Sequence, residues 1–273
     1  MLFQDSAGKN MNEFDYRKYP NKLNLGCGFD KRPGYTNVDM NSFHAPDLIC
    51  DVLDLNVLPK NYYVEIVAQD ILEHLPRNLT KSALVHWASF LHTGGNLVLR
   101  VPNVLGLLKL LSARQNQTLE RHEAFIQDLF GTQAYSGDFH YTSFTEIILR
   151  SYLVECGFVV MEIKDVDGWL FDVSARKDRV VSPEEIGDFS DLLRQDFSNL
   201  EFVKAAYLKI LNREPDPEGL NFYVSNLDEK KRSRDQLLYD LCNSAERSPQ
   251  TSRSQLVPRS LIGKMKDVFL GHT

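Results

Sequence analysis

The sequence predicts an α/β fold with a mostly parallel sheet covered by helices on both faces, followed by a smaller all-helical unit. Over residues 20–176, short apolar runs alternate with segments of helical spacing, and strand signals stop after Lys177. Parallel neighbours need crossover connections, so this alternation favours a parallel sheet. In such sheets ligands bind beyond the carboxyl ends of the strands. Candidate site residues are therefore those that directly follow a strand.

The first half of the predicted sheet consists of brief apolar runs, each bounded by turn residues. Four strands are expected there, at Lys22–Leu25, Thr36–Val38, Asp47–Cys50 and Val64–Ala68. Apolar residues at helical spacing then predict a helix over Leu79–Leu91, ended by Gly94-Gly95. The strand Asn96–Val101 completes one more strand-helix-strand step.

The second half begins with a change of pattern between Asn103 and Tyr141, where two helical segments precede a glycine-bearing loop. We interpret residues 103–141 as a substrate-covering insertion. A helix over Thr142–Cys156 and the strands Phe158–Ile163 and Trp169–Ala175 follow. A turn at residues 165–168 joins the two strands, which we expect to pair antiparallel.

The composition turns acidic and polar after Lys177, which predicts a domain boundary near residue 180. We expect an N-terminal extension (1–19), a catalytic domain (20–180), a linker (181–199), a helical domain (200–250) and a tail (251–273). In the tail, Leu256–Gly271 has the pattern of an amphipathic helix, which is compatible with docking on a partner protein or a membrane surface.

The overall composition is that of a soluble globular protein, with 43% hydrophobic and 25% charged residues. No apolar stretch reaches the roughly 18 residues of a membrane helix, and Met1–Tyr19 lacks the apolar block of a signal peptide. We therefore expect a cytoplasmic protein, with the periphery of the inner membrane as an alternative. The four cysteines form no CxxC pair and are interpreted as buried thiols.

A net charge of −6 without a long basic run makes nucleic acid an improbable partner, because phosphate binding needs concentrated Lys and Arg. A small-molecule or glycan acceptor fits better. Composition leaves the oligomeric state open.

Gly26-Cys27-Gly28 directly follows the first predicted strand, and glycine lets the backbone approach a ligand closely. By itself this turn is weak evidence. Asp39 directly follows the second strand, where its carboxylate can accept hydrogen bonds from a ribose diol. Asp51 follows the third strand and can accept from an adenine amine while Val52 or Leu53 packs on the ring. The alternative for Asp51 is a turn or cap aspartate.

Two runs of this sequence resemble the class I S-adenosylmethionine-dependent methyltransferases. They are Leu23-Asn24-Leu25-Gly26-Cys27-Gly28 and Pro33-Gly34-Tyr35-Thr36-Asn37-Val38-Asp39. More narrowly, they are similar to a bacterial subgroup like methyltransferase type 11. The segments Ala68–Leu75 and Gly94–Asn103 look like its fourth- and fifth-strand motifs. The resemblance covers roughly residues 20–176, the size of a catalytic domain.

The resemblance implies S-adenosyl-L-methionine as cofactor and a Rossmann-like seven-stranded sheet of order 3-2-1-4-5-7-6 with strand 7 antiparallel. It places Gly26 and Gly28 near the methionine part of the cofactor, Asp39 at the ribose and Asp51 at the adenine. The matching segments add five cofactor-binding candidates, namely Asn24, Cys27, Met40, Val52 and Gln69.

The spacing between the turn and the acidic residue is short, because Asp39 lies eleven residues after Gly28. The dinucleotide-binding fingerprint has roughly 20 residues there. A full helix does not fit in this crossover, which speaks against NAD.

Three residues are candidates for catalysis. Methyl transfer is an in-line displacement that depends on positioning, and a base is needed only for a poorly acidic acceptor such as a sugar hydroxyl. His140, at the end of the insertion, is the favoured base, and His74, after the fourth strand, competes with it. Asp70 lies at the same strand end and can contact cofactor or acceptor. For all three, a structural hydrogen bond is the alternative.

We expect no required metal, because Asp47, Asp51 and Asp54 are spread along a strand end and its loop.

The second unit reads as a helix, a proline-marked turn and further helices between Glu201 and Glu246. It resembles a small helical domain of unknown function that recurs beside glycan-modifying enzymes. Arg213, Asp216 and Glu246 are expected to form a charged network between its helices.

The leading hypothesis is an enzyme that O-methylates a sugar hydroxyl of a bacterial polysaccharide or its precursor. Methylation of a nitrogen or a carboxylate in a small metabolite is a second reading, and a non-catalytic scaffold is a third. A sugar site presents polar groups and an aromatic face, for which Tyr135, Tyr141 and Trp169 are suited, whereas an acidic acceptor requires an Arg or Lys pair.

Overall fold

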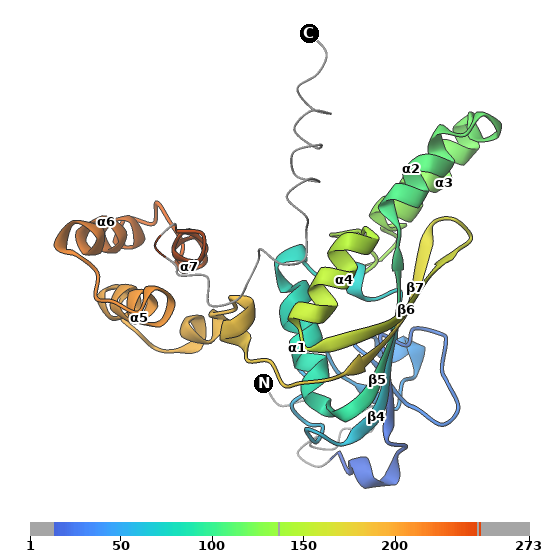
Figure 1. Cartoon of the computed structure of the whole chain (residues 1–273), viewed down its shortest axis with the longest axis horizontal. Helices are drawn as coiled ribbons and strands as arrows, with labels where there is room; N and C mark the ends of the chain where they lie inside the picture. Colours follow the sequence, from blue (N-terminus) through green and yellow to red (C-terminus); the bar gives the residue numbers. More distant parts are fainter. Residues whose placement is uncertain (1–13, 136, 245, 247–273) are drawn as a thin grey trace. The chain divides into compact units, whose positions relative to one another are not determined.

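The computed structural model describes residues 14–135, 137–244 and 246 (Figure 1). The chain divides into two compact units, residues 1–181 and 182–273. The helix expected in the tail lies outside the described residues.

The first unit is built on one seven-stranded sheet in the order β3-β2-β1-β4-β5-β7-β6. β7 runs antiparallel to β5 and β6, and the remaining neighbours are parallel. The predicted order and the antiparallel strand 7 are thus confirmed. The strands are β1 (Lys22–Leu25), β2 (Thr36–Asp39), β3 (Leu48–Ile49), β4 (Tyr63–Gln69), β5 (Leu91–Pro102), β6 (Phe158–Val166) and β7 (Leu170–Lys177).

β1 lies inside the sheet, where Leu23 pairs with Thr36 of β2 on one side and with Ile66 of β4 on the other. Leu23 and Leu25 are fully buried. Because β1, β2, β4 and β5 are parallel, their carboxyl ends lie at one edge of the sheet. The segments that start at Gly26, Met40, Asp70 and Asn103 are therefore brought to this edge.

Two helices, α1 (Thr80–Phe90) and α4 (Glu146–Glu155), lie side by side on one face of the sheet (Figure 1). Lys81 Nζ of α1 pairs with Glu155 Oε2 of α4 at 2.5 Å. Short 3-10 turns complete the unit, at η1 (Tyr16–Lys18), η2 (Ser42–His44), η3 (Leu72–His74) and η4 (Arg77–Leu79).

The second helical layer predicted for the opposite face is missing among the described residues. No described α-helix connects β1 to β2 or β2 to β3, because these crossovers are short and the second contains only η2. Along β5 and β7 buried residues alternate with partly exposed ones, such as Arg100 and Asp172. This alternation is typical of a sheet with one open face.

The end of the helix predicted over Leu79–Leu91 also differs. α1 ends at Phe90 without the help of the glycine pair, and Gly94-Gly95 lie inside β5. The pairing with β4 shifts there, since Tyr63 pairs with Leu91 whereas Glu65 pairs with Asn96. The glycines therefore belong to an irregularity in the strand, a position that glycine often marks.

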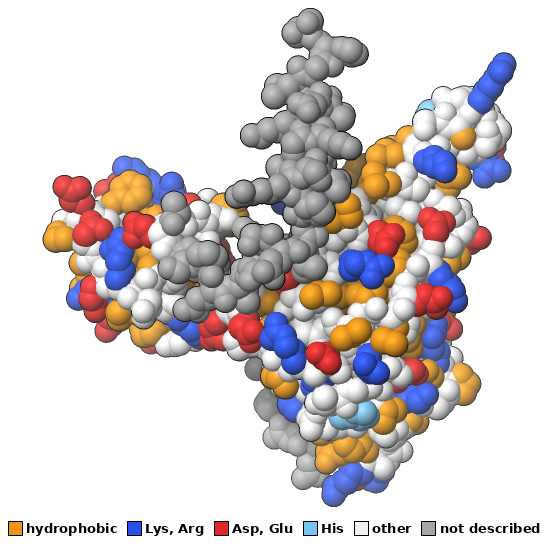
Figure 2. Space-filling model, in the orientation of Figure 1, with side chains coloured by type: hydrophobic (Ala, Val, Ile, Leu, Met, Phe, Trp, Pro, Cys, Tyr) orange, Lys and Arg blue, Asp and Glu red, His pale blue; other side chains and the backbone are white. Residues whose placement is uncertain are grey.

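The insertion forms α2 (Val104–Ser112), η5 (Arg114–Asn116) and α3 (Leu119–Phe130), which extend as an arm beyond the sheet (Figure 1). Asn103 caps α2 by accepting a hydrogen bond from Gly106 N at 3.1 Å. Hydrophobic side chains are visible along the arm in Figure 2. The exposed apolar residues of α2 and α3 include Leu105, Leu108, Leu119 and Ile126.

The helix predicted from Thr142 begins only at Glu146, with Thr145 as its N-cap. The preceding residues are held in extended form at the end of β5, where Phe144 N donates to Pro102 O at 3.1 Å.

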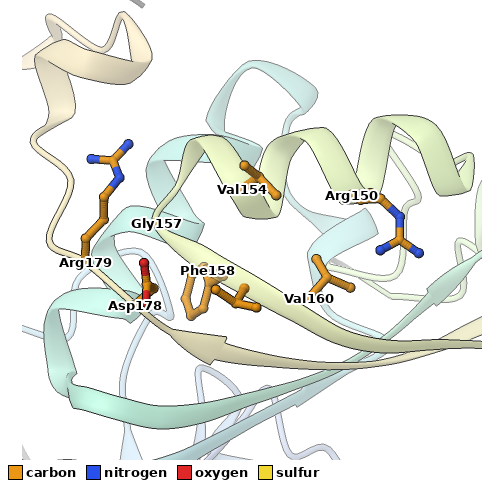
Figure 3. Close-up of a pocket in the computed structure, with 8 residues that line it drawn as sticks. Arg150, Val154, Gly157, Phe158, Val160, Asp178 and Arg179 are labelled. Carbon is orange, nitrogen blue, oxygen red and sulfur yellow. The ribbon is translucent and has the colours of Figure 1, made fainter. Parts of the chain in front are cut away.

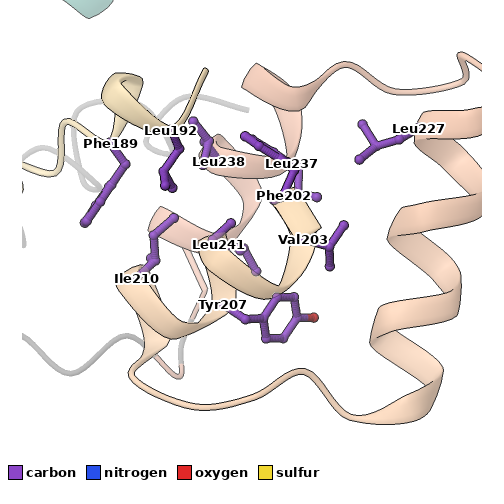
Figure 4. Packing of buried hydrophobic residues seen from close by; sticks show 11 residues of the cluster. Phe189, Leu192, Phe202, Val203, Tyr207, Ile210, Leu227, Leu237, Leu238 and Leu241 are labelled. Atoms are coloured by element: carbon purple, nitrogen blue, oxygen red, sulfur yellow. The ribbon is translucent and has the colours of Figure 1, made fainter. Parts of the chain in front are cut away.

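The second unit contains η6 (Pro183–Ile186), η7 (Ser190–Arg194), α5 (Asn199–Leu211), α6 (Pro217–Asp228) and α7 (Arg234–Cys242). Figure 4 shows its apolar core, in which Phe202, Val203 and Leu237 are fully buried. Arg213 pairs with Glu246 at 2.6 Å and with Asp216 at 3.6 Å, so the charged network expected from the sequence is present.

Residues 181–199 were expected to be a linker, but most of them belong to this unit. Phe189 and Leu192 are buried in the helical core (Figure 4). Ser182 and Glu185 form a capping box at the start of η6, so the acidic run begins a helical turn. None of the described helices is both long and apolar enough to cross a membrane.

Candidate active site

The glycine turn after β1 is held by backbone hydrogen bonds. Gly26 and Gly28 have φ values of +61° and +49°, in the left-handed region that favours glycine. Cys27 N donates to Val38 O of β2 at 3.0 Å. A Cβ on Gly26 would lie 2.6 Å from the side chain of Ile71, whereas a Cβ on Gly28 would meet nothing within 4 Å. Packing against Ile71 therefore requires Gly26, and the space beside Gly28 is open.

Asp39 binds this turn directly. Its Oδ2 accepts from Gly28 N at 2.8 Å and its Oδ1 accepts from Asn41 N at 2.8 Å, and the residue is only 5% exposed. His44 Nδ1 lies 3.1 Å from Oδ1 without hydrogen-bond geometry. A carboxylate has about four acceptor positions. Asp39 thus orders the turn and keeps acceptor capacity for a ligand.

Other residues predicted at the cofactor are used within the protein. The amide of Asn24 donates to Asp30 O at 2.8 Å and to Asn37 Oδ1 at 3.0 Å. Gln69 accepts from Arg32, and Met40 is exposed beside Asp39. Burial, followed by the charge of Asp39, raises the pKa of the Cys27 thiol to about 11, so this thiol is neutral.

Asp51 and Val52 follow β3 at the same edge. Asp51 is exposed, and its Oδ1 accepts from Leu53 N at 2.8 Å, the turn arrangement that competes with the adenine role. Val52 is buried, and its carbonyl accepts from Trp87 Nε1 at 2.9 Å. Both roles at the adenine stay predictions.

His74 and His140 come together beyond the end of β4, and Asp70, which directly follows β4, interacts electrostatically with His140. The rings of His74 and His140 lie edge to face with centroids 4.6 Å apart. Asp70 has a φ of +52°, and its N donates to Arg100 O at 3.0 Å. Burial raises the pKa of Asp70 above its usual value, and the charge of Arg100 partly offsets this shift.

The tautomer of His140 follows from its partner. Nδ1 lies 3.0 Å from Asp128 O, and because a carbonyl can only accept, Nδ1 carries the hydrogen. The lone pair is therefore on Nε2. Burial lowers the pKa of His140, which keeps the ring neutral near pH 7.

Glu73 is a member of this cluster that the sequence analysis did not select. It is 1% exposed, and burial raises its pKa to about 8. Glu73, His74 and His140 each offer a ligand atom within 4.8 Å of the others. The Glu73-His74 pair is adjacent in the sequence, but no local pattern there indicates that both side chains meet His140.

The loop from Gly131 to Tyr141 contacts two segments at this edge of the sheet, one after β4 and one after β2. Tyr141 N donates to Glu73 O at 2.8 Å, and the ring of Tyr135 lies 6.3 Å from that of Phe43, in the segment after β2. Tyr135 and Tyr141 are both about half exposed. Trp169 is half-buried at the start of β7, and its carbonyl accepts from Asn103 N at 2.7 Å.

A pocket of about 330 Å³ lies elsewhere, between α4 and the paired ends of β6 and β7 (Figure 3). Its lining includes Phe158 and Asp178 but none of the candidate site residues. Since β7 is antiparallel, its carboxyl end lies at the edge of the sheet opposite Gly26 and Asp70. This pocket is not the candidate active site.

Comparison with known families gives a match for the C-terminal part of the chain. Residues 182–250 match the family described as "Domain of unknown function (DUF4214)". No curated protein matches the chain.

Several solved structures are similar to part of the chain. One is a possible exported protein from Bordetella parapertussis, at 16% identity and a TM-score of 0.43, with 59% of this chain and 63% of that chain covered. Another is an S-adenosylmethionine-dependent methyltransferase from Methanosarcina mazei, at 19% identity and a TM-score of 0.42, covering 57% and 92%. A third is the 1,6-didemethyltoxoflavin-N1-methyltransferase of Burkholderia thailandensis with bound S-adenosylhomocysteine, at 14% identity and 0.40, covering 60% and 74%.

Proposed function

We propose that the chain is an S-adenosyl-L-methionine-dependent methyltransferase that methylates a hydroxyl group, with a sugar of a bacterial polysaccharide or its precursor as acceptor. The observation that carries the proposal is the Gly26–Gly28 turn bound by Asp39 at the same sheet edge as His140 and Asp70. The shared edge is the place where α/β sheets bind ligands.

In this proposal the open space beside Gly28 receives the methionine part of the cofactor. The remaining acceptor positions of Asp39 bind the ribose hydroxyls. Asp51, Val52, Met40 and Gln69 surround the adenosine, as the resemblance implies. The reaction is an in-line displacement: the acceptor oxygen forms a bond to the methyl carbon while the carbon–sulfur bond breaks and leaves a thioether.

His140 is the proposed base. Its Nδ1–H donates to Asp128 O, so Nε2 is free to take the hydroxyl proton as the methyl is transferred. His74 packs against the ring edge to face and fixes its orientation. Asp70 stabilises the imidazolium that forms, since its charge acts on His140.

The charges around the site support a hydroxyl acceptor over a carboxylate. Two arginines act on Asp70, and both are already paired: Arg100 with Asp172 through two hydrogen bonds, and Arg32 with Asp30 and Gln69. A carboxylate acceptor calls for unpaired Arg or Lys. The aromatic rings of Tyr135 and Tyr141 offer faces on which a sugar ring can pack.

The cellular location and the partners are also proposals. We infer that the protein works in the cytoplasm, where polysaccharide precursors and the cofactor are available, and that the second unit contacts a partner protein or the membrane surface.

The test has two stages. Calorimetry with S-adenosyl-L-methionine should show binding to the full chain, and no heat at millimolar cofactor would refute the proposal. Incubation with labelled cofactor and a panel of nucleotide sugars and lipid-linked glycan precursors should then give a labelled glycan. Labelling of amines or carboxylates alone would reassign the acceptor.

A further inference from the structure

Two segments far apart in the sequence bring a carboxylate and two imidazoles together. Glu73 and His74 come from η3, just after β4, and His140 comes from the loop that follows α3. One ligand atom from each of the three residues lies within 4.8 Å of the other two. The cluster adjoins the glycine turn, since Ile71 lies against Gly26.

Backbone hydrogen bonds hold the two segments that carry these side chains. Tyr141 N donates to Glu73 O at 2.8 Å, and His140 N donates to Phe130 O at 3.0 Å. His140 Nδ1–H donates to the carbonyl of Asp128, so Nε2 is the ring nitrogen that can bind a metal ion. Such a bond from the second ring nitrogen is the usual way in which proteins orient a metal-binding histidine.

Two buried polar atoms in the cluster have no hydrogen-bond partner among the described residues. They are Glu73 Oε2 and His74 Nδ1, and Glu73 is 1% exposed. An unsatisfied buried polar group costs about 1–3 kcal/mol, so such groups are uncommon in proteins. A bound cation would satisfy the carboxylate oxygen and an imidazole nitrogen together.

The local charge also favours a cation. The charge that acts on Glu73 is that of Asp70, and the nearby guanidinium of Arg100 is paired with Asp172. Asp70 therefore adds negative charge beside a site that contains no positive side chain of its own.

The donor set selects the kind of cation. Two nitrogens and one carboxylate oxygen suit zinc and its first-row neighbours, whereas calcium and magnesium prefer oxygen ligands alone. At bond lengths of about 2.1 Å, tetrahedral ligand atoms lie about 3.4 Å apart. The cluster needs only a small closing movement to reach that spacing.

We propose that Glu73, His74 and His140 bind one first-row divalent cation of the zinc class. Cation binding does not depend on the proposed function, but the consequence for catalysis rests on it. In the loaded protein His140 is a ligand instead of the base, and a cation with an open position would acidify an acceptor hydroxyl. The proposed cation site is contrary to the expectation from the sequence that no metal is required.

The experiment uses the full chain after removal of metals with a chelator. Titration with cobalt(II), followed by its visible absorption and by elemental analysis, should saturate at one cobalt per chain, and zinc should displace the cobalt. Loss of one ligand should weaken binding by roughly tenfold or more. We therefore expect weaker cobalt binding in Glu73→Gln and His140→Ala, with Glu73→Gln preserving the side-chain shape.

His92→Ala is the matched control, because His92 is a partly exposed imidazole in β5 whose Nδ1 bonds the carbonyl of Thr93. It should bind cobalt like the unaltered protein. Circular dichroism checks that each variant is folded. No cobalt uptake by the unaltered protein would overturn the inference, as would Glu73→Gln and His140→Ala variants that bind cobalt as tightly as the unaltered protein.

Cofactor calorimetry on the same samples separates this inference from the proposed function. Asp39→Ala should lose cofactor affinity and keep cobalt. Cobalt binding without any cofactor binding would support the cation site and refute the methyltransferase. If the chelated protein takes up no cobalt but still binds the cofactor and is active, the methyltransferase proposal is supported and the cation site is refuted.

Discussion

Two glycines in the turn after β1 have similar backbone angles but different surroundings. A Cβ at position 26 would overlap Ile71 at 2.6 Å, and one at position 28 would enter open space. A positive φ alone costs a non-glycine residue about 1–2 kcal/mol. Gly26→Ala should therefore lower the free energy of unfolding more than Gly28→Ala, because it adds a steric overlap to the same strain. Urea unfolding of both variants measures the difference.

If the two variants lose equal stability, Ile71 moves aside freely and packing does not explain Gly26. Gly28→Ala has a second use, since its Cβ would occupy the space proposed for the cofactor. We expect it to weaken S-adenosyl-L-methionine binding in calorimetry by more than its stability loss explains.

Asp39 combines a structural and a proposed binding role. Asp39→Ala removes the acceptors of Gly28 N and Asn41 N and of the proposed ribose bonds, so cofactor affinity should fall by roughly 1–3 kcal/mol, about 5- to 150-fold. Asp54→Ala is the control, because Asp54 is an exposed carboxylate after β3 whose side chain bonds Asn56. Unchanged affinity in a folded Asp39→Ala protein would remove Asp39 from the site.

At the scale of single elements, α5 offers a measurable cap. Ser198 accepts from Glu201 N at 3.3 Å, and Glu201 accepts from Ser198 N at 2.8 Å, which forms a capping box. Ser198→Ala should destabilise the helical unit by about 1 kcal/mol. Lys204→Ala, at an exposed position of the same helix, should leave the stability nearly unchanged.

Chemical denaturation followed by circular dichroism compares these two variants. A loss of equal size in both would mean that α5 is stabilised by its packing and that the cap contributes nothing.

Element boundaries were predictable where local chemistry decides them and failed where a distant segment intervenes. β1 has the predicted bounds, because an apolar run ends there at a glycine turn. α4 starts four residues later than predicted, because Pro102 of β5 binds the preceding chain. The spacing within residues 142–145 contains no sign of that contact.

For the whole molecule, the division into two units predicts separable stabilities. All the candidate site residues lie in the first unit, between Asn24 and His140, whereas Phe202 is fully buried in the helical core. Phe202→Ala should destabilise the helical unit by about 3–5 kcal/mol through the cavity it leaves. The affinity for S-adenosyl-L-methionine should stay unchanged.

Hydrogen exchange resolved by peptide, together with calorimetry, checks both parts. Faster exchange confined to α5, α6 and α7 with unaltered cofactor binding is expected. A loss of cofactor affinity would show that the site depends on the second unit.

The linker prediction failed because local composition does not reveal contacts with distant segments. The acidic segment Pro183–Glu185 has the composition of a linker, and only the burial of Phe189 and Leu192 against α5 and α7 assigns it to the helical unit. A charged, proline-containing segment has the same composition whether it joins two units or starts a helical turn.

Residue pattern and motifs predicted the alternating strands, their order through a family resemblance, and the glycine turn with Asp39, because periodicity, turn residues and short motifs are local properties. Long-range packing showed that Asp39 binds Gly28, that Ile71 requires Gly26, and that Glu73 and His74 meet His140. These contacts join segments far apart in the chain, and their distances depend on how the strands pair and on the course of the loop after α3.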